Sequence, residues 1–268
     1  MRRLLVVVVL LLAPPAVARA ATVLGSQGNA RVTAGSDEVN DVIVTQTPRG
    51  LLRLRDRSAR LRVRRGCRRM DLHTVRCGPT EAPVVRLGDE DDMLTARLPR
   101  GAGLIASGGP GDDVLTGGPE PDQLSGGRGV DRLDVAGNGP ADLARCGGGA
   151  DVVVSTSRDT VAECEVLAPP SGAGLDVAVL PTADADSADF TVACTGPLAP
   201  GCLAILRLSG PEGEAYGERA VALAPGRTGA TVRVPLTPAG KAAIRAGAVL
   251  VVDVDGGGEV YGYRVTLP

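Results

Sequence analysis

The chain has 268 residues, of which 44% are hydrophobic and 22% are charged, and its formal net charge is -2 at pH 7. A charge so close to zero argues against a general binder of polyanions such as nucleic acid. Aromatic residues are nearly absent, with three Tyr, one Phe and no Trp. A core without large rings must be built from Val, Leu, Ile and Ala, which suits a narrow stack in which each turn packs only on its neighbours.

The N-terminus has the pattern of a secretory signal peptide over residues 1–20. Three residues, Met-Arg-Arg, precede nine branched apolar residues from Leu4 to Leu12, and an Ala-x-Ala sequence ends at Ala20. A membrane anchor is the alternative, but a spanning helix needs about 20 apolar residues. No later apolar run reaches that length, so we expect a secreted or cell-surface protein with no transmembrane segment.

Six cysteines form an even set in a chain that we expect to be exported, which favours disulfides. The zinc alternative needs tight Cys/His clusters, but there is no Cys-x-x-Cys sequence and His73 is the single histidine. Six cysteines allow fifteen pairings. Proximity along the chain favours three local disulfides: Cys67–Cys77, Cys146–Cys164 and Cys194–Cys202.

A stretch rich in Pro, Gly and Ser at residues 168–174 is typical of a linker. Before it, over residues 21–167, short runs with a period of two are bounded by Gly, Pro or Asp and predict strands. These runs include Val42–Thr45, Leu52–Arg55 and Leu61–Arg64. No long amphipathic pattern predicts a helix in this part of the chain.

After the linker, residues 175–268 predict a small β-sandwich with one short helix. Thr237, Pro238 and Gly247 stand where an N-cap, a first helical residue and a C-terminal glycine are preferred. Seven short strands at this spacing are typical of a sandwich, which is immunoglobulin-like in architecture only because Trp is absent. The predicted strands are Leu175–Leu180, Phe190–Cys194, Leu203–Leu208, Arg219–Leu223, Ala230–Leu236, Val249–Val254 and Glu259–Leu267.

A nine-residue repeat lies in the middle of the chain, with its core over residues 108–154. Three tandem units align as Gly-Gly-x-Gly-x-Asp-x-Leu-x. The one departure is Glu120, which replaces the third glycine in the second unit. These units are residues 108–116, 117–125 and 126–134. Looser units with an aspartate in the same position are residues 87–95, 137–145 and 146–154.

The nonapeptide resembles that of the haemolysin-type, or repeats-in-toxin, calcium-binding family. The resemblance implies that the Gly-rich part forms a turn, that the last three residues form a strand, and that two units make one coil of a parallel β-roll. It also implies Ca²⁺ ions between turns stacked on the same side. Glycine permits the left-handed backbone that turns carbonyl oxygens toward an ion, and aspartate supplies the hard oxygen that calcium prefers. The candidate glycines are Gly109, Gly111, Gly127 and Gly129.

Eighteen residues per coil decide which aspartates can share an ion. Asp113 and Asp131 differ by eighteen residues, so we expect them on the same side of adjacent coils as the first calcium site. Asp122 and Asp142 form a second, weaker candidate on the other side, where a two-residue insertion makes the offset twenty. Asp92 and Asp113, twenty-one residues apart, are a third candidate.

Two flanking segments, residues 86–92 and 145–165, resemble segments of actinobacterial proteins that carry these repeats. That resemblance implies one continuous solenoid from about residue 22 to residue 165, closed by the Cys146–Cys164 disulfide. The segment around Cys194–Cys202 looks like a module appended in the same proteins. The chain departs from typical family members, which have longer arrays and a C-terminal secretion signal. A calcium-free solenoid that uses Gly-Asp turns only for shape is the alternative.

Ten arginines lie between Arg49 and Arg69. One interpretation is a patch for an anionic cell-surface polymer, and the other, which we favour, is the solvated face of alternating strands. No aromatic residue lies among them for base stacking, so no nucleic-acid partner is expected.

No serine-nucleophile, P-loop or dinucleotide signature is present, and His73 has no second histidine with which to build a catalytic site, so we expect no enzyme. The sequence therefore predicts an all-β protein, a parallel β-roll or β-solenoid followed by a small immunoglobulin-like β-sandwich. We expect it to bind calcium and to act as a structural or binding module. The alternatives are a calcium-independent cell-surface adhesin or wall-binding protein and a secreted hydrolase with an accessory roll.

Overall fold

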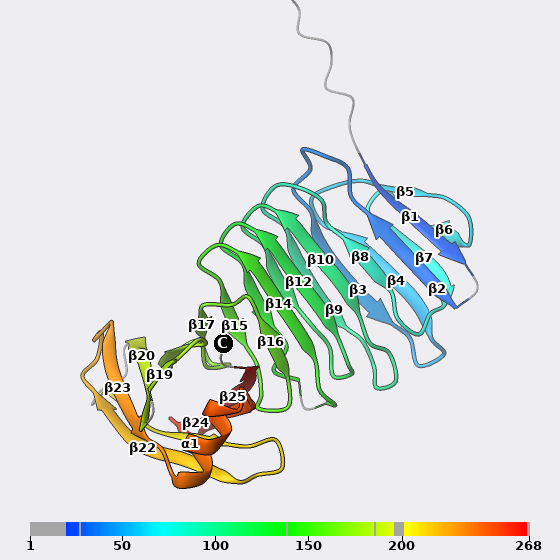
Figure 1. The fold of residues 1–268 in the computed structure, drawn as a ribbon. Coiled ribbons are helices and arrows are strands. Elements are labelled where there is room, and N and C mark those ends of the chain that lie inside the picture. The colour runs from blue at the N-terminus through cyan, green and yellow to red at the C-terminus, as the bar shows by residue number, and fades with distance from the viewer. Residues whose placement is uncertain (1–19, 27, 138, 185, 196–200, 267–268) are drawn as a thin grey trace, which may run out of the picture.

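The computed structural model describes residues 20–26, 28–137, 139–184, 186–195 and 201–266, and the predicted signal peptide lies outside this part except for Ala20. The described chain is all-β apart from helix α1 (Pro238–Arg245) (Figure 1). The prediction of an all-β chain is therefore confirmed. No helix in the described ranges is long and apolar enough to cross a membrane.

The strands form two large sheets. The first sheet has twelve strands, in the spatial order β22 (Ala215–Leu223), β21 (Cys202–Ser209), β24 (Val249–Gly256), β25 (Glu259–Thr266), β16 (Thr160–Ala162), β14 (Leu143–Gly148), β12 (Gln123–Arg128), β10 (Ile105–Pro110), β8 (Val84–Arg86), β2 (Asn29–Thr33), β1 (Ala21–Ser26) and β5 (Leu61–Val63). The second sheet has thirteen strands when β23 is included. Twelve follow the order β19 (Thr182–Ala183), β20 (Ser187–Thr195), β18 (Gly174–Ala178), β17 (Val166–Leu167), β15 (Val152–Val154), β13 (Arg132–Asp134), β11 (Val114–Thr116), β9 (Met93–Arg97), β3 (Asp41–Gln46), β4 (Leu51–Asp56), β7 (Thr74–Pro79) and β6 (Cys67–Arg69), and β23 (Ala230–Pro235) pairs with β20.

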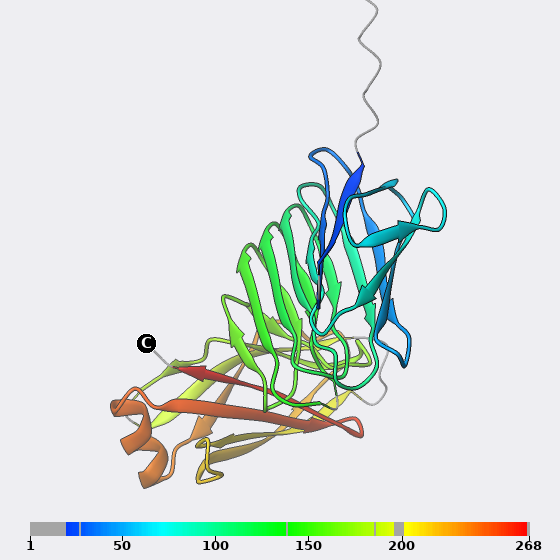
Figure 2. The same ribbon diagram turned by 90° about the vertical axis from the view of Figure 1, so that its right-hand side faces the viewer.

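Between β8 and β17 successive strands alternate between the two sheets, and every pair formed there is parallel (Figures 1 and 2). Each repeat unit supplies one short strand and one inward aliphatic side chain. Leu115 and Leu133 from the second sheet and Leu124 from the first are at most 2% exposed and belong to one core. A period of two within each strand therefore turns the same repeat position inward in both sheets.

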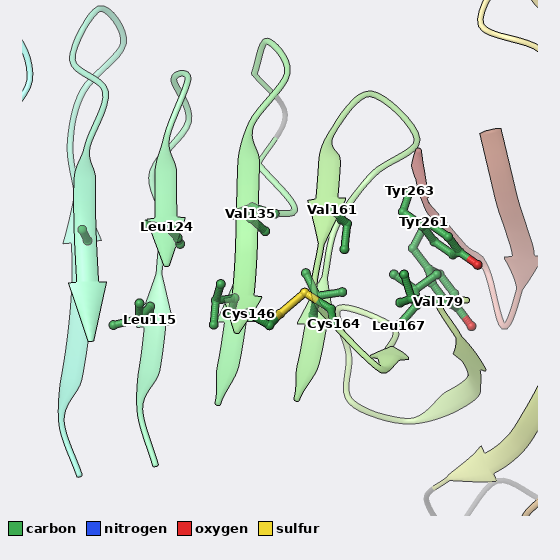
Figure 3. Close-up of a cluster of buried hydrophobic side chains, with 14 of the residues drawn as sticks. Leu115, Leu124, Val135, Cys146, Val161, Cys164, Leu167, Val179, Tyr261 and Tyr263 are labelled. Atoms are coloured by element: carbon green, nitrogen blue, oxygen red, sulfur yellow. A yellow bond between two sulfur atoms is a disulfide. The ribbon is translucent and has the colours of Figure 1, made fainter. Parts of the chain in front are cut away.

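The core continues without aromatic residues until the last strands. Figure 3 shows buried side chains running from Leu115 and Leu124, past the Cys146–Cys164 disulfide, to Tyr261 and Tyr263. The hydroxyl of Tyr261 donates to the carbonyl of Leu175 at 2.6 Å, so both sides of this contact come from beyond the repeat. Large rings thus enter the core where the stacked strands end.

The predicted strands of residues 175–268 are confirmed as β18 and β20 to β25, with bounds that differ by a few residues and with a further two-residue strand, β19. The helix prediction is also confirmed, because the Thr237 side chain accepts the N–H of Gly240 at 3.1 Å and Pro238 begins α1. Of the earlier runs, β3, β4 and β5 match the predicted strands.

Strand pairing continues across residues 168–174. Strand β17 pairs antiparallel with β18, and β16 meets β25 through Thr160 and Arg264. The sequence stretch that predicts a linker therefore joins strands that are neighbours in one sheet. The division into domains at residues 21–167 and 175–268 stays a prediction.

All three predicted disulfides are present: Cys67–Cys77, Cys146–Cys164 and Cys194–Cys202. The described chain has no free cysteine. Each bridge is local, joining residues 10, 18 and 8 positions apart.

Candidate metal centre

The aspartates of the repeat lie in the turns that connect the two sheets. We call the turns that lead from the first sheet to the second the first edge; they include residues 111–113, 129–131 and 149–151. The turns that lead back form the second edge, which includes residues 117–122, 135–137, 139–142 and 155–159. Each aspartate is the last residue of its turn, directly before a strand.

On the first edge, four aspartates form a column that we call the first aspartate ladder. Its members are at most 3% exposed, and they are Asp92, Asp113, Asp131 and Asp151. The backbone N–H of each member donates to the Oδ1 of the next one along the stack. The N–O distances are 3.0 Å from Asp92 to Asp113, 2.9 Å from Asp113 to Asp131 and 2.7 Å from Asp131 to Asp151.

The first ladder has a different residue at each end. At its start the N–H of Asn40 donates to Oδ1 of Asp92 at 2.7 Å, and at its end Oε2 of Glu165 accepts the N–H of Asp151 at 2.8 Å. The predicted pairs Asp113–Asp131 and Asp92–Asp113 are thus neighbours on one side of the stack. Whether they share an ion stays a prediction.

The second carboxylate oxygen of each ladder member, Oδ2, is buried and has no hydrogen-bond partner in the described chain. In Asp113 and Asp131 it points back toward the first glycine of the unit: a Cβ on Gly108 would overlap the carboxylate of Asp113, and one on Gly126 would overlap that of Asp131. Glycine at the start of the repeat therefore leaves the space that the carboxylate occupies. An unpartnered buried oxygen of this kind is costly unless a proton or a cation satisfies it.

Burial disfavours the ionised form of the carboxyl groups in the first ladder. Loss of solvent raises the pKa of Asp92 and of Asp113 to about 7, and the neighbouring ladder charges act in the same direction. Burial, with a contribution from the charge of Asp151, also raises the pKa of Asp131. Outside the ladder, the exposed Asp91 and Asp112 accept backbone N–H groups of the next turn and add negative charge to the same edge.

On the second edge, three buried aspartates form the second aspartate ladder: Asp122, Asp142 and Asp159. Their Oδ1 atoms accept backbone N–H groups in the same way, from Asp122 to Asp142 at 2.7 Å and from Asp142 to Asp159 at 3.0 Å. Here Oδ2 of two members also has partners. Gly118 N–H donates to Oδ2 of Asp122 at 2.5 Å, and the N–H and hydroxyl of Thr156 donate to Oδ2 of Asp159.

The second ladder is buried too, and loss of solvent raises the pKa of Asp142 to about 7 and also raises that of Asp122. Asp122 and Asp142 are neighbours, as the sequence predicts, but Asp122 has no carboxylate oxygen left without a donor. A calcium site on this edge remains a prediction with fewer free ligands than the first edge has.

The four candidate glycines, Gly109, Gly111, Gly127 and Gly129, have φ angles between 133° and 142°. Side chains rarely tolerate such angles. The packing forbids a side chain as well, because a Cβ on Gly127 would overlap the carbonyl oxygen of Gly109, and one on Gly129 would overlap that of Gly111. These glycines are therefore needed for turns to stack directly on one another, with or without an ion.

The donors of the first edge fit Ca²⁺ in their chemistry, since they are charged oxygens with one position each unsatisfied. Side chains alone do not complete a coordination shell, because no three His, Cys, Asp or Glu residues of the described ranges converge as a metal site. Calcium also accepts backbone carbonyl and water oxygens.

Sequence reasoning missed the ends of both ladders. Asp151 follows Asp131 by twenty residues, the same offset that links Asp122 to Asp142. The looser unit 146–154 could therefore have shown that Asp151 is the next member of the column. Asn40, Asp159 and Glu165 lie outside the nonapeptide units, and the resemblance of segment 145–165 does not mark Asp159 or Glu165 as ladder residues. Only the pairing of their strands brings them to the ladders.

The arginines of residues 49–69 lie around β4, β5 and β6 at the N-terminal end of the stack. Arg53 and Arg55 alternate with the buried Leu52 and Leu54, so the expected solvated face of alternating strands is confirmed for β4.

No family model matches the chain, and comparisons with curated proteins and with solved structures give no significant match either.

Proposed function

We propose that this chain is an exported calcium-binding β-roll that acts as a structural or binding module, joined to a small β-sandwich. The observation that carries the proposal is the column of four buried Oδ2 atoms in the first aspartate ladder, each without a hydrogen-bond donor among the described residues. A divalent cation would satisfy these oxygens and remove the repulsion between neighbouring carboxylates. The tandem nonapeptide, which resembles the repeats-in-toxin unit, is an independent reason to choose calcium.

Export is part of the proposal. Three disulfides favour an oxidising compartment, and the sequence of residues 1–20 is typical of a signal peptide. No enzymatic role is proposed, because the buried carboxylates take part in backbone ladders rather than in a pair of groups facing a substrate.

The rival account is a calcium-free roll in which protons satisfy the first ladder, and a titration separates the two. We expect Ca²⁺ to bind the mature protein at pH 7.5 with a dissociation constant of roughly 10⁻⁴–10⁻³ M, the range of extracellular sites. Isothermal titration calorimetry measures this, with Mg²⁺ as the control, since Mg²⁺ gives up its water reluctantly. Absence of both binding heat and thermal stabilisation at about 10 mM Ca²⁺, well above that range, would leave the proton-satisfied roll.

A further inference from the structure

The N-terminal end of the second sheet carries a straight row of arginines that the calcium proposal does not use. Strand register places Arg97 opposite Thr45, Thr45 opposite Arg53, Arg53 opposite Arg76 and Arg76 opposite Arg68. Residues directly opposite one another in a sheet point to the same face. We call these four the arginine row: Arg97, Arg53, Arg76 and Arg68.

The row crosses the five strands β9, β3, β4, β7 and β6. At about 4.8 Å per strand, three of its members stand on adjacent strands and the fourth lies two strands away. All four side chains are exposed, and none forms an ion pair with a residue that the structure describes. Arg55, two residues after Arg53 and on the same face of β4, adds a fifth exposed cation, which forms no ion pair with a described residue.

Across these five strands, the described residues of the same face carry no free negative charge to balance the row. Among the described outward residues of these five strands the one acid is Asp41, and Arg57 already binds it at 2.7 Å. Like charges directly opposite in a sheet destabilise it. Repulsion between the opposite arginines therefore destabilises the sheet, and an anionic ligand would relieve this repulsion.

We infer that the arginine row binds a linear acidic polysaccharide, whose carboxylates lie along the row across the strands. The guanidinium group pairs with a planar carboxylate through two parallel hydrogen bonds, which Lys cannot do. Between and beside the arginines the face offers the hydroxyls of Thr45 and Thr95 and the aliphatic side chain of Ile43. A sugar chain presents hydroxyl groups and C–H surfaces that match these side chains.

Other polyanions fit this face less well. Nucleic acid binding without sequence preference uses aromatic side chains for stacking, and the four aromatic residues of the chain all lie beyond residue 189. For a lipid surface, the tip of the β6–β7 hairpin exposes Met70 and Leu72, but Asp71 stands between them. The backbone N–H of His73 lowers the pKa of Asp71, so its charge opposes insertion among anionic lipids.

The test measures binding of polygalacturonate to the mature protein by biolayer interferometry, in EDTA so that calcium neither bridges the partners nor fills the ladder. We expect binding that weakens as salt is raised, because the contacts are exposed charges. The double variant Arg53→Gln/Arg76→Gln should bind about tenfold more weakly, since two of the central bidentate contacts are lost. The matched control Arg219→Gln/Arg245→Gln removes the same charge from exposed positions in β22 and α1 and should change the affinity less than about twofold.

A folding defect is separated from a binding defect by thermal melting without ligand, where Arg53→Gln/Arg76→Gln should melt at or above the wild-type temperature because like-charge repulsion is relieved. Equal loss of binding in the control variant would overturn the inference. So would wild-type binding to methyl-esterified polygalacturonate, polyphosphate, single-stranded DNA or phosphatidylglycerol vesicles that is as tight as binding to polygalacturonate. Failure of the wild type to bind at low salt would overturn it as well, and would leave the calcium proposal untouched.

Discussion

The two edges of the stack are built from the same repeat, yet they treat the aspartate differently. On both edges Oδ1 accepts a backbone N–H from the adjacent turn, which ties one turn to the next. On the second edge Gly118 N–H also donates to Oδ2 of Asp122, whereas on the first edge Oδ2 of Asp113 has no donor among the described residues. On the second edge the protein itself supplies donors to both oxygens of Asp122 and Asp159, whereas the Oδ2 atoms of the first ladder lack a donor among the described residues.

The difference follows from where the strands end. On the first edge, strand pairing continues through the second glycine of the unit, with Gly109 opposite Gly127 and Gly127 opposite Gly147. On the second edge, β11 ends at Thr116, so Gly118 lies in the turn and its N–H is free to reach Asp122. The end of β11 thus leaves a backbone N–H for the second oxygen of Asp122.

The largest expected effect is on the pH dependence of stability without calcium. Asp92 and Asp113 have pKa values of about 7 in the folded chain, against 3.8 for an ordinary Asp. Because the folded state holds more protons, its advantage is complete below pH 3.8 and is lost as pH rises to about 7. We expect the free energy of unfolding in EDTA to fall by on the order of a few kcal/mol from pH 4 to 7.5, measured by chemical denaturation.

Calcium should reduce this dependence of the free energy of unfolding on pH, because the ion takes the place of the protons on the first ladder. The double variant Asp92→Asn/Asp113→Asn should reduce it without calcium. Asp142 on the second edge, with a pKa of about 7, keeps part of the pH dependence in that variant. A stability that rises from pH 4 to 7.5 in EDTA contradicts the burial of these carboxylates.

The next largest effect is expected from Gly→Ala substitutions, which should destabilise the protein more on the first edge than on the second. Gly127→Ala places a Cβ on the carbonyl oxygen of Gly109 at a φ of 142°, and should cost about 2–4 kcal/mol. Gly118→Ala, the same position of the preceding unit, meets nothing closer than Leu98 Cβ at 3.6 Å and should cost less than about 1 kcal/mol. Equal losses in urea denaturation would mean that the two edges stack alike.

Much of the strand pattern could be predicted from the sequence, because alternation and turn residues act over short distances. The three disulfides are local, and α1 is defined by Thr237 and Pro238 at its start. The repeat period also places Asp113 beside Asp131 and Asp122 beside Asp142, as the ladder hydrogen bonds confirm.

What the sequence could not show depends on register between distant strands. Asn40 and Asp92 meet across fifty-two residues because β3 pairs with β9, and no local pattern encodes that pairing. The arginine row has the same origin, since Arg76 and Arg97 lie outside the arginine-rich segment and join it only through strand pairing. Whether Oδ2 of an aspartate finds a hydrogen-bond donor depends on where a strand ends, and strand ends are the feature that sequence patterns predict least reliably.

The central claim is that a cation satisfies the unpaired Oδ2 atoms of the first edge, whereas the protein itself satisfies Asp122 on the second edge. Thermal melting at pH 7.5 with and without about 1 mM Ca²⁺ tests it most directly. With a dissociation constant of roughly 10⁻⁴–10⁻³ M, one site should stabilise the wild type by about 0.4–1.4 kcal/mol. Asp131→Asn should lose most of this calcium-dependent gain while keeping its stability in EDTA, because Asn still accepts the N–H of Asp113. Asp122→Asn should melt lower in EDTA, because its amide faces the N–H of Gly118, and should keep the gain from calcium. A calcium gain that survives in Asp131→Asn and disappears in Asp122→Asn would contradict the account.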